Sequence, residues 1–155
     1  VAFERLKESG AIQLEADGRN PKTLKMMLDK GVISRLKFYL RGPAPVYGAI
    51  TGMPLDQTEL MDSLSLLNDS FEYQIILPVA AFVREDGQAG YLTPEEAADA
   101  AKLAADATSS KKHPFFIQPG TLPDELKIDP LAASAFFKYR TQCRRHMVQC
   151  EIMKT

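Results

Sequence analysis

A continuous apolar run over residues 71–83 constrains the fold more than any other part of the chain. Within it, apolar and polar side chains alternate from residue 71 to residue 77, which is the pattern of a strand buried on one face. The apolar positions are Phe71, Tyr73, Ile75 and Leu77. Pro78 then removes a backbone donor, so we expect regular pairing to end there. The run is interrupted by this proline and is shorter than the ~20 apolar residues of a membrane-spanning helix, so it indicates a protein core.

Length and composition are those of one ordinary globular domain. The chain has 155 residues, of which 45% are hydrophobic and 25% are charged, and about 68–70% of the unfolded surface can be buried at this size. We therefore predict a single domain over residues 1–155, with proline-rich connections near residues 41–54 and 109–130. The net charge of −1 argues against a strong electrostatic attraction to nucleic acid or to an anionic membrane.

The charges are unevenly distributed along the chain. Residues 85–106 contain six acidic side chains and one lysine, whereas residues 138–155 contain five basic side chains and one glutamate. A dipolar surface of this kind is suited to docking on a partner, although charged patches are also common on surfaces that contact only water. The basic side chains that we assign to a docking surface are Lys138, Arg140, Arg144 and Arg145.

Hydrophobic periodicity and turn signals predict an α+β fold. Several short helices are expected to pack on a small mixed or antiparallel sheet centred on residues 71–77, with further strands near residues 11–16, 46–51 and 115–118. Five or six helices are expected: over residues 1–9, between Asn20 and Leu40 with a bend or break at Gly31, after Asp56, after Thr93, and from Asp129 to Cys150.

Two apolar features have no evident place in the core of this predicted fold. The helix after Thr93 has an almost all-alanine face over residues 97–104, and a small-residue face lets another backbone approach closely. Phe115, Phe116 and Ile117 lie in a long proline-rich connection, where apolar side chains need a cover. Both features favour a surface that is covered by a partner protein.

The cysteines and the N-terminus bear on the compartment. Cys143 and Cys150 are seven residues apart in a predicted helix, which separates their Cα atoms by ~10.5 Å, beyond the ~7 Å limit of a disulfide. Together with His146 they have metal-ligand spacing, but no metal site is predicted. The chain begins with Val1 and lacks a signal-peptide pattern. An intracellular, reducing compartment is expected. The N-terminus has two readings: the chain is a mature protein processed on import into an organelle, or the sequence is simply the visible part of the protein.

Residues 85–96 resemble the calcium-binding loop of the EF-hand family. A glycine stands at the sharp turn, and Glu96 occupies the terminal bidentate position. The first position holds Glu85 instead of aspartate, and the third and fifth positions hold Gly87 and Ala89, which have no side-chain oxygen. The resemblance covers 12 of 155 residues and implies, as one alternative function, a small-ligand or ion-binding regulatory domain with a degenerate loop.

The inventory of catalytic motifs is poor. The sequence contains no nucleophile elbow, phosphate-binding glycine loop or zinc-protease motif, so we predict no catalytic residue, cofactor or metal. An enzyme with a dispersed site is a further alternative, which would require a deep pocket lined by His113 or His146 beside a buried carboxylate.

Our leading hypothesis is a non-catalytic accessory or scaffold subunit of a larger multiprotein assembly. Other protein subunits are the expected partners, with no nucleic acid and no transmembrane segment, and peripheral contact with a membrane complex is compatible with this reading. The predicted docking residues are Phe115, Phe116, Ile117, Lys138, Arg140, Arg144 and Arg145.

Overall fold

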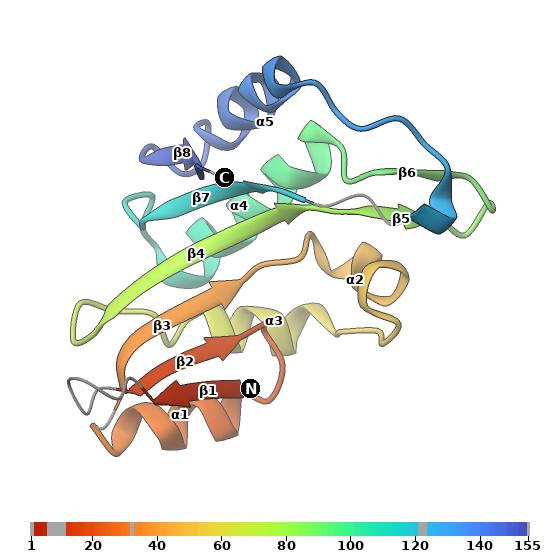
Figure 1. The fold of residues 1–155 in the computed structure, drawn as a ribbon. Helices are drawn as coiled ribbons and strands as arrows, with labels where there is room; N and C mark the ends of the chain where they lie inside the picture. Colours follow the sequence, from red (N-terminus) through yellow and green to blue (C-terminus); the bar gives the residue numbers. More distant parts are fainter. Residues whose placement is uncertain (1, 6–11, 32, 121–123, 155) are drawn as a thin grey trace.

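A six-stranded sheet forms the centre of the protein in a computed structural model that describes residues 2–5, 12–31, 33–120 and 124–154. Its strand order is β1-β2-β3-β4-β7-β8 (Figure 1). The edge strand β1 (Ala2–Arg5) pairs antiparallel with β2 (Ile12–Ala16). All other neighbours pair in parallel, namely β2 with β3 (Ile33–Tyr39), β3 with β4 (Glu72–Val79), β4 with β7 (Phe115–Pro119) and β7 with β8 (Cys150–Ile152).

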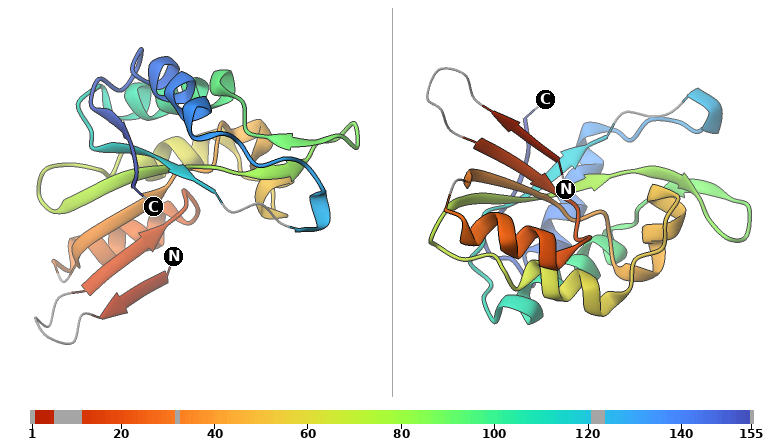
Figure 2. Two further views of the ribbon diagram at one scale, coloured as in Figure 1. Left: turned by 45° about the horizontal axis from the view of Figure 1, so that its top comes forward. Right: turned by 90° about the horizontal axis from the view of Figure 1, so that it is seen from below.

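Helices connect the parallel strands. The connections carry α1 (Pro21–Asp29), α2 (Ala44–Thr51), α3 (Gln57–Leu64), α4 (Pro94–Thr108) and α5 (Phe136–Cys143). Figures 1 and 2 show α1, α3, α4 and α5 as one layer on a single face of the sheet, and α3 contacts α1 and α4 within that layer. Short 3-10 helices span Asp124–Leu126 and Ala133–Ala135. Beyond the carboxyl end of β4, a hairpin of β5 (Ala81–Val83) and β6 (Ala89–Tyr91) extends away from the sheet.

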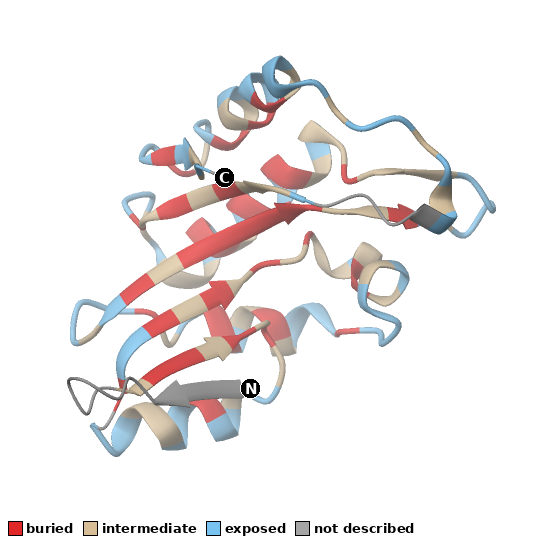
Figure 3. Cartoon of the chain, in the orientation of Figure 1, coloured by how far each residue is buried: buried red, intermediate tan, exposed pale blue. Residues whose placement is uncertain are grey.

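The core lies between the sheet and the helix layer. Alternate residues of the strands point toward the helices and are buried (Figure 3), among them Leu14, Leu36, Phe38, Ile75, Leu77, Phe115 and Ile117. The small face of α4 completes this core, because Ala97, Ala100, Ala101 and Ala104 are fully buried. The alanine face is therefore used inside the domain, where it lets α4 pack closely against α5 and α3.

The opposite face of the sheet is mostly polar, and the described helices do not cover it (Figures 1 and 3). Its side chains include Gln13, Glu15, Arg35, Lys37, Gln74 and Gln118. Tyr39, Ile76 and Phe116 are register partners across β3, β4 and β7 and form a short apolar row in its middle. Parallel sheets are usually covered on both faces, so the polar side chains explain how this one tolerates an open face.

The prediction of a mixed helix-and-strand protein is confirmed, but the sheet is mostly parallel and larger than expected. Strands predicted at residues 11–16, 71–77 and 115–118 correspond to β2, β4 and β7. The helix starts predicted at Asp56 and Thr93 are also confirmed, since both residues cap helices with their side chains. Local capping chemistry was thus a sound guide to these two helices.

Four predicted elements are wrong. Residues 2–5 form the strand β1 instead of a helix, and residues 33–39 form β3, in which Leu36 and Phe38 point inward at period two. Residues 46–51 belong to the helix α2, whose first turn contains Pro45. The last helix ends at Cys143, and Cys150 begins β8.

No helix in the described part of the chain has the length and apolar character needed to cross a bilayer.

Candidate functional site

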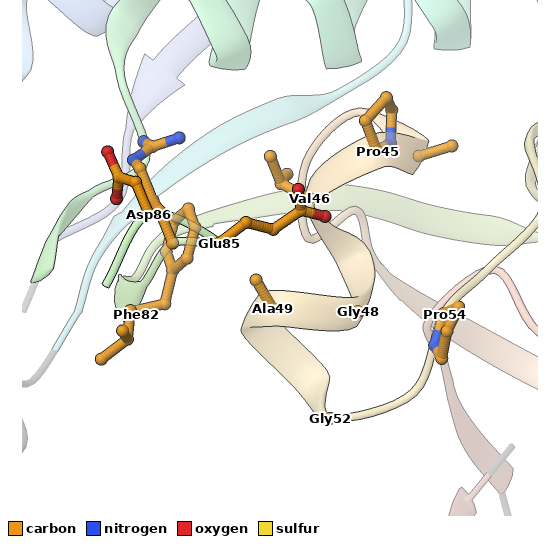
Figure 4. A pocket seen from close by; sticks show the side chains of 12 residues that line it. Pro45, Val46, Gly48, Ala49, Gly52, Pro54, Phe82, Glu85 and Asp86 are labelled. Carbon is orange, nitrogen blue, oxygen red and sulfur yellow. The ribbon is translucent and has the colours of Figure 1, made fainter. Parts of the chain in front are cut away.

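A groove of about 900 Å³ lies at the carboxyl edge of the parallel strands, between α2 and the β5–β6 hairpin (Figure 4). Ligands of open α/β sheets commonly bind outside the carboxyl ends of the strands, at a reversal of strand order. This sheet has no such reversal, but the groove lies at the same edge, between α2, which follows β3, and the hairpin, which follows β4. The groove is therefore the first candidate for a binding site.

The α2 wall of this groove is uncharged. No charged residue occurs from Gly42 to Leu55, and the groove-lining side chains of this segment include Val46, Ala49 and Pro54. Met53, next to the wall, is 62% exposed. A helix that is apolar around its circumference is normally buried, so this partly exposed helix is unusual for a surface element.

Two polar side chains hold the α2 wall in place. The buried Tyr47 hydroxyl donates to the Asp17 carbonyl at 3.0 Å and accepts from the Arg41 backbone N–H at 2.9 Å, and burial strongly raises the pKa of Tyr47. The Arg19 guanidinium donates to the carbonyl oxygens of Met53 and Pro54 and to Thr51 Oγ1, at 2.6–3.0 Å. The apolar wall is thus preorganised by contacts to the end of β2.

The hairpin wall is fixed to α4 by an ion pair. The Arg84 guanidinium donates to both carboxylate oxygens of Glu96 at 2.7 and 2.8 Å, and stacks 4.7 Å from the centre of the Phe82 ring. Hydrogen bonds from Arg84, and then from the Thr93 backbone, lower the pKa of Glu96 despite its partial burial. The cation at this wall is therefore already neutralised within the protein.

The rim of the groove is acidic. Glu85 and Asp86 are exposed groove-lining residues. Among the described residues the Glu85 side chain has no polar partner, and the Asp86 carboxylate accepts only the Gln88 backbone N–H, at 2.9 Å. The groove therefore combines an apolar wall with an acidic rim, in which the Asp86 charge acts on the nearby Arg84 guanidinium and Glu85 has no ion-pair partner among the described residues. In Figure 4 the labelled side chains of the hairpin lie across the groove from those of α2.

A second surface with unusual exposure lies on α5. Phe137 is 54% exposed, and the Arg140 guanidinium lies 5.2 Å from the centre of its ring. The predicted docking residues Lys138, Arg144 and Arg145 lie on α5 or in the turn after it. We call Phe137, Lys138, Arg140 and Arg145 the α5 face. Sequence reasoning found its cations but missed Phe137, whose exposure depends on which side of α5 packs on the core.

Phe115, Phe116 and Ile117 were predicted both in a strand near residues 115–118 and in a proline-rich connection that a partner covers, and the structure confirms the strand and not the connection. All three are in β7, with Phe115 and Ile117 fully buried beneath the helix layer and Phe116 on the opposite face of the sheet. Their proline-rich flanks resembled a loop, but pairing with β4 and β8 makes this segment a central strand. The structure does not bring these residues together with the basic residues of α5 on one surface.

The loop that resembles an EF-hand has a different geometry. Residues 81–91 form a β-hairpin instead of the entering helix and loop of that family, and the Glu96 carboxylate is engaged by Arg84 and by the backbone N–H of Thr93. A calcium ion would have to displace these contacts. In the described residues no three side chains of His, Cys, Asp or Glu are grouped so as to hold a metal ion.

Cys143 and Cys150 are adjacent, and the prediction that helical spacing separates them is wrong. The chain turns after α5 and returns as β8, which brings the two buried thiols into contact. The hydrogen bond with Cys150, together with burial, strongly raises the pKa of the Cys143 thiol. Protonated, buried thiols of this kind are apolar packing residues with low reactivity.

His113 belongs to a directed chain of hydrogen bonds at the amino ends of β4 and β7. Thr108 Oγ1 donates to the Ala104 carbonyl at 2.7 Å and lies 2.6 Å from His113 Nε2, so Nε2 carries the proton and donates to Thr108. His113 Nδ1 therefore accepts from the Tyr73 hydroxyl, 2.5 Å away. Burial lowers the pKa of His113, in keeping with a neutral ring. Neither His113 nor His146 lines the groove, and the chain serves to connect α4 to the sheet.

This histidine predicts a pH dependence of stability. An unfolded histidine titrates near 6.5, whereas burial lowers the pKa of folded His113. The unfolded state therefore takes up the proton first, so the free energy of unfolding is greatest above pH 6.5 and falls below it, by up to about 1.4 kcal/mol per pH unit. Urea unfolding at pH 7.5 and 5.0 measures this loss. His113→Gln should reduce this loss. His146→Gln should also reduce it, because burial and the neighbouring cations lower the pKa of His146 as well. An unchanged loss of stability at pH 5.0 in His113→Gln would contradict the assignment.

Comparison of the chain with protein-family models, with curated proteins and with solved structures finds no match. The functional interpretation therefore depends on the groove, the α5 face and their electrostatics.

Proposed function

We propose that this protein is a non-catalytic docking domain that binds an apolar and basic segment of a partner protein in the groove between α2 and the β5–β6 hairpin. The observation that carries the proposal is the combination of an uncharged wall over residues 42–55 with an acidic rim formed by the exposed Glu85 and Asp86. The leading hypothesis of an accessory subunit is thereby retained, but its docking surface moves from β7 to the carboxyl edge of the sheet.

A peptide segment fits the chemistry of the groove better than the other classes of ligand. Nucleic acid and anionic lipid are repelled by Glu85 and Asp86. An amphipathic helix or an extended segment with spaced apolar side chains can cover a shallow apolar wall, and lysine or arginine at its edge can pair with the acidic rim. The small side chains of Gly48 and Ala49 allow its backbone to approach α2 closely.

A peptide titration tests this function. We expect a fluorescein-labelled amphipathic peptide of leucine and lysine, with helical spacing, to bind the protein, with fluorescence anisotropy as the measure. Ala49→Arg, which places a bulky cation on the apolar wall, and the double variant Glu85→Lys/Asp86→Lys should each weaken binding at least about tenfold, or about 1.4 kcal/mol.

The control variant is Asp99→Lys, which changes charge in the same sense at an exposed position of α4 outside the groove. It should bind the peptide with nearly the affinity of the wild type. A peptide in which glutamate replaces lysine should bind more weakly than the basic peptide. Equal affinity of the wild type and both groove variants would contradict the proposed function.

A further inference from the structure

We propose that the groove accepts the α5 face of a second copy of this chain, so that protomers associate head to tail. This inference depends on the proposed function, because it names an occupant for the same groove. The occupant must combine exposed apolar side chains with unneutralised cations, and the α5 face has both.

The apolar part of the α5 face is formed by Phe137, which is 54% exposed. An aromatic side chain of this size, placed on a rigid helix, is the kind of residue that anchors protein interfaces. The Arg140 guanidinium already stacks on the Phe137 ring, so the ring and the cation are presented together without further ordering.

The cationic part consists of Lys138 and Arg145. In the described part of the chain Lys138 makes no ion pair or side-chain hydrogen bond, and the Arg145 guanidinium donates only to Gln142 Oε1, at 3.3 Å. By contrast, Arg140 and Arg144 are paired with Glu151. Two cations on the α5 face and the Glu85 carboxylate at the groove rim therefore lack ion-pair partners among the described residues of their own protomer, whereas the Asp86 charge lies near Arg84.

A protomer cannot satisfy both surfaces by itself. The α5 face and the groove are formed by separate elements in different parts of the molecule, the first on α5 and the second between α2 and the hairpin (Figure 1). Contact between them therefore requires another copy. Since the two surfaces differ, the contact is heterologous, and a bound pair still exposes one groove and one α5 face for further association.

Sedimentation velocity over a range of protein concentrations, at low and high salt, tests the inference. The wild type should form species that increase in mass with concentration, and the association should weaken in high salt, because salt screens the charges. The groove variant Glu85→Lys/Asp86→Lys and the face variant Lys138→Glu/Arg145→Glu should each weaken self-association at least about tenfold, because like charges then meet. Phe137→Ala should weaken it by a comparable factor.

Mixing the two charge-reversed variants is the decisive measurement. An equimolar mixture should regain association, because carboxylates and cations again face each other, whereas damage to the fold of either variant cannot be repaired by mixing. Circular dichroism confirms that each variant is folded. If association does not recover on mixing, the head-to-tail contact is overturned. If both variants still form the same oligomer as the wild type, the contact lies elsewhere and the inference is overturned as well.

The peptide titration separates this inference from the proposed function. If the wild type stays monomeric at all concentrations while the basic peptide still binds in the groove, the second copy is excluded and the docking function stands. If the peptide does not bind and the protein is monomeric, both are overturned.

Discussion

Phe115→Ala should lower the free energy of unfolding by about 3–5 kcal/mol, the usual cost of emptying a large aromatic site in a core. Phe115 is fully buried in β7, with register partners in both β4 and β8. The surrounding strand backbones are paired on both sides, so the cavity cannot collapse easily. Chemical denaturation followed by circular dichroism measures the loss.

The neighbouring residue is the matched control for this variant. Phe116 points to the opposite face of the sheet, where it is only partly buried. Phe116→Ala should therefore cost about 1–2 kcal/mol, in proportion to the smaller apolar area that leaves the protein interior. Equal losses in the two variants would show that the side-chain alternation of β7 is misassigned.

Gly18→Ala should have the second large effect, with a loss of about 2–4 kcal/mol from backbone strain and overpacking together. Gly18 has φ +96°, a conformation that favours glycine, and an added Cβ would lie 2.5 Å from Leu60 Cδ1 in the core. The Gly18 carbonyl also accepts the buried Ser63 hydroxyl at 2.8 Å. Any shift of the backbone would disturb this hydrogen bond between the end of β2 and α3.

Gly52→Ala separates the two parts of that cost. Gly52 has a similar φ of +83°, but no atom lies within 4 Å of the position of an added Cβ. Its loss should be about 1 kcal/mol, from the left-handed backbone alone. The difference in thermal or denaturant stability between the two variants then reports the packing of Gly18 against Leu60, and a difference near zero would argue against this close approach.

The sequence was sufficient where structure is determined by local chemistry. The alternation over residues 71–77 predicted β4, and the Thr93 cap with Glu96 three residues later predicted α4, with the reciprocal hydrogen bonds that the structure contains. In each case the signal lies within a few residues, so it does not depend on the rest of the fold.

Sequence reasoning failed where distant segments decide the structure. Residues 33–39 have apolar spacings that also suit a helix, and their strand conformation depends on pairing with both β2 and β4. The extension of the last helix to Cys150 failed for a similar reason, since β8 forms by pairing with β7. Periodicity within a short apolar segment cannot distinguish these alternatives.

The candidate site was only half predictable. The basic residues of α5 are visible as a local excess of charge, but the groove joins residues 44–54 to residues 82–86, which only the folded chain brings together. The absence of charge from Gly42 to Leu55 was the available signal. Because Pro43, Pro45 and Pro54 dominate its local pattern, the segment predicts a proline-rich connection with a strand near residues 46–51 instead.

The strand order of the large sheet has a consequence for biosynthesis. From β1 to β8, each strand of this sheet lies next to the one that precedes it along the chain, apart from the β5–β6 hairpin that stays outside it. No strand has to be inserted between two others that have already joined. Each newly translated unit can therefore add to the growing edge as it leaves the ribosome, which makes the fold compatible with vectorial, cotranslational assembly.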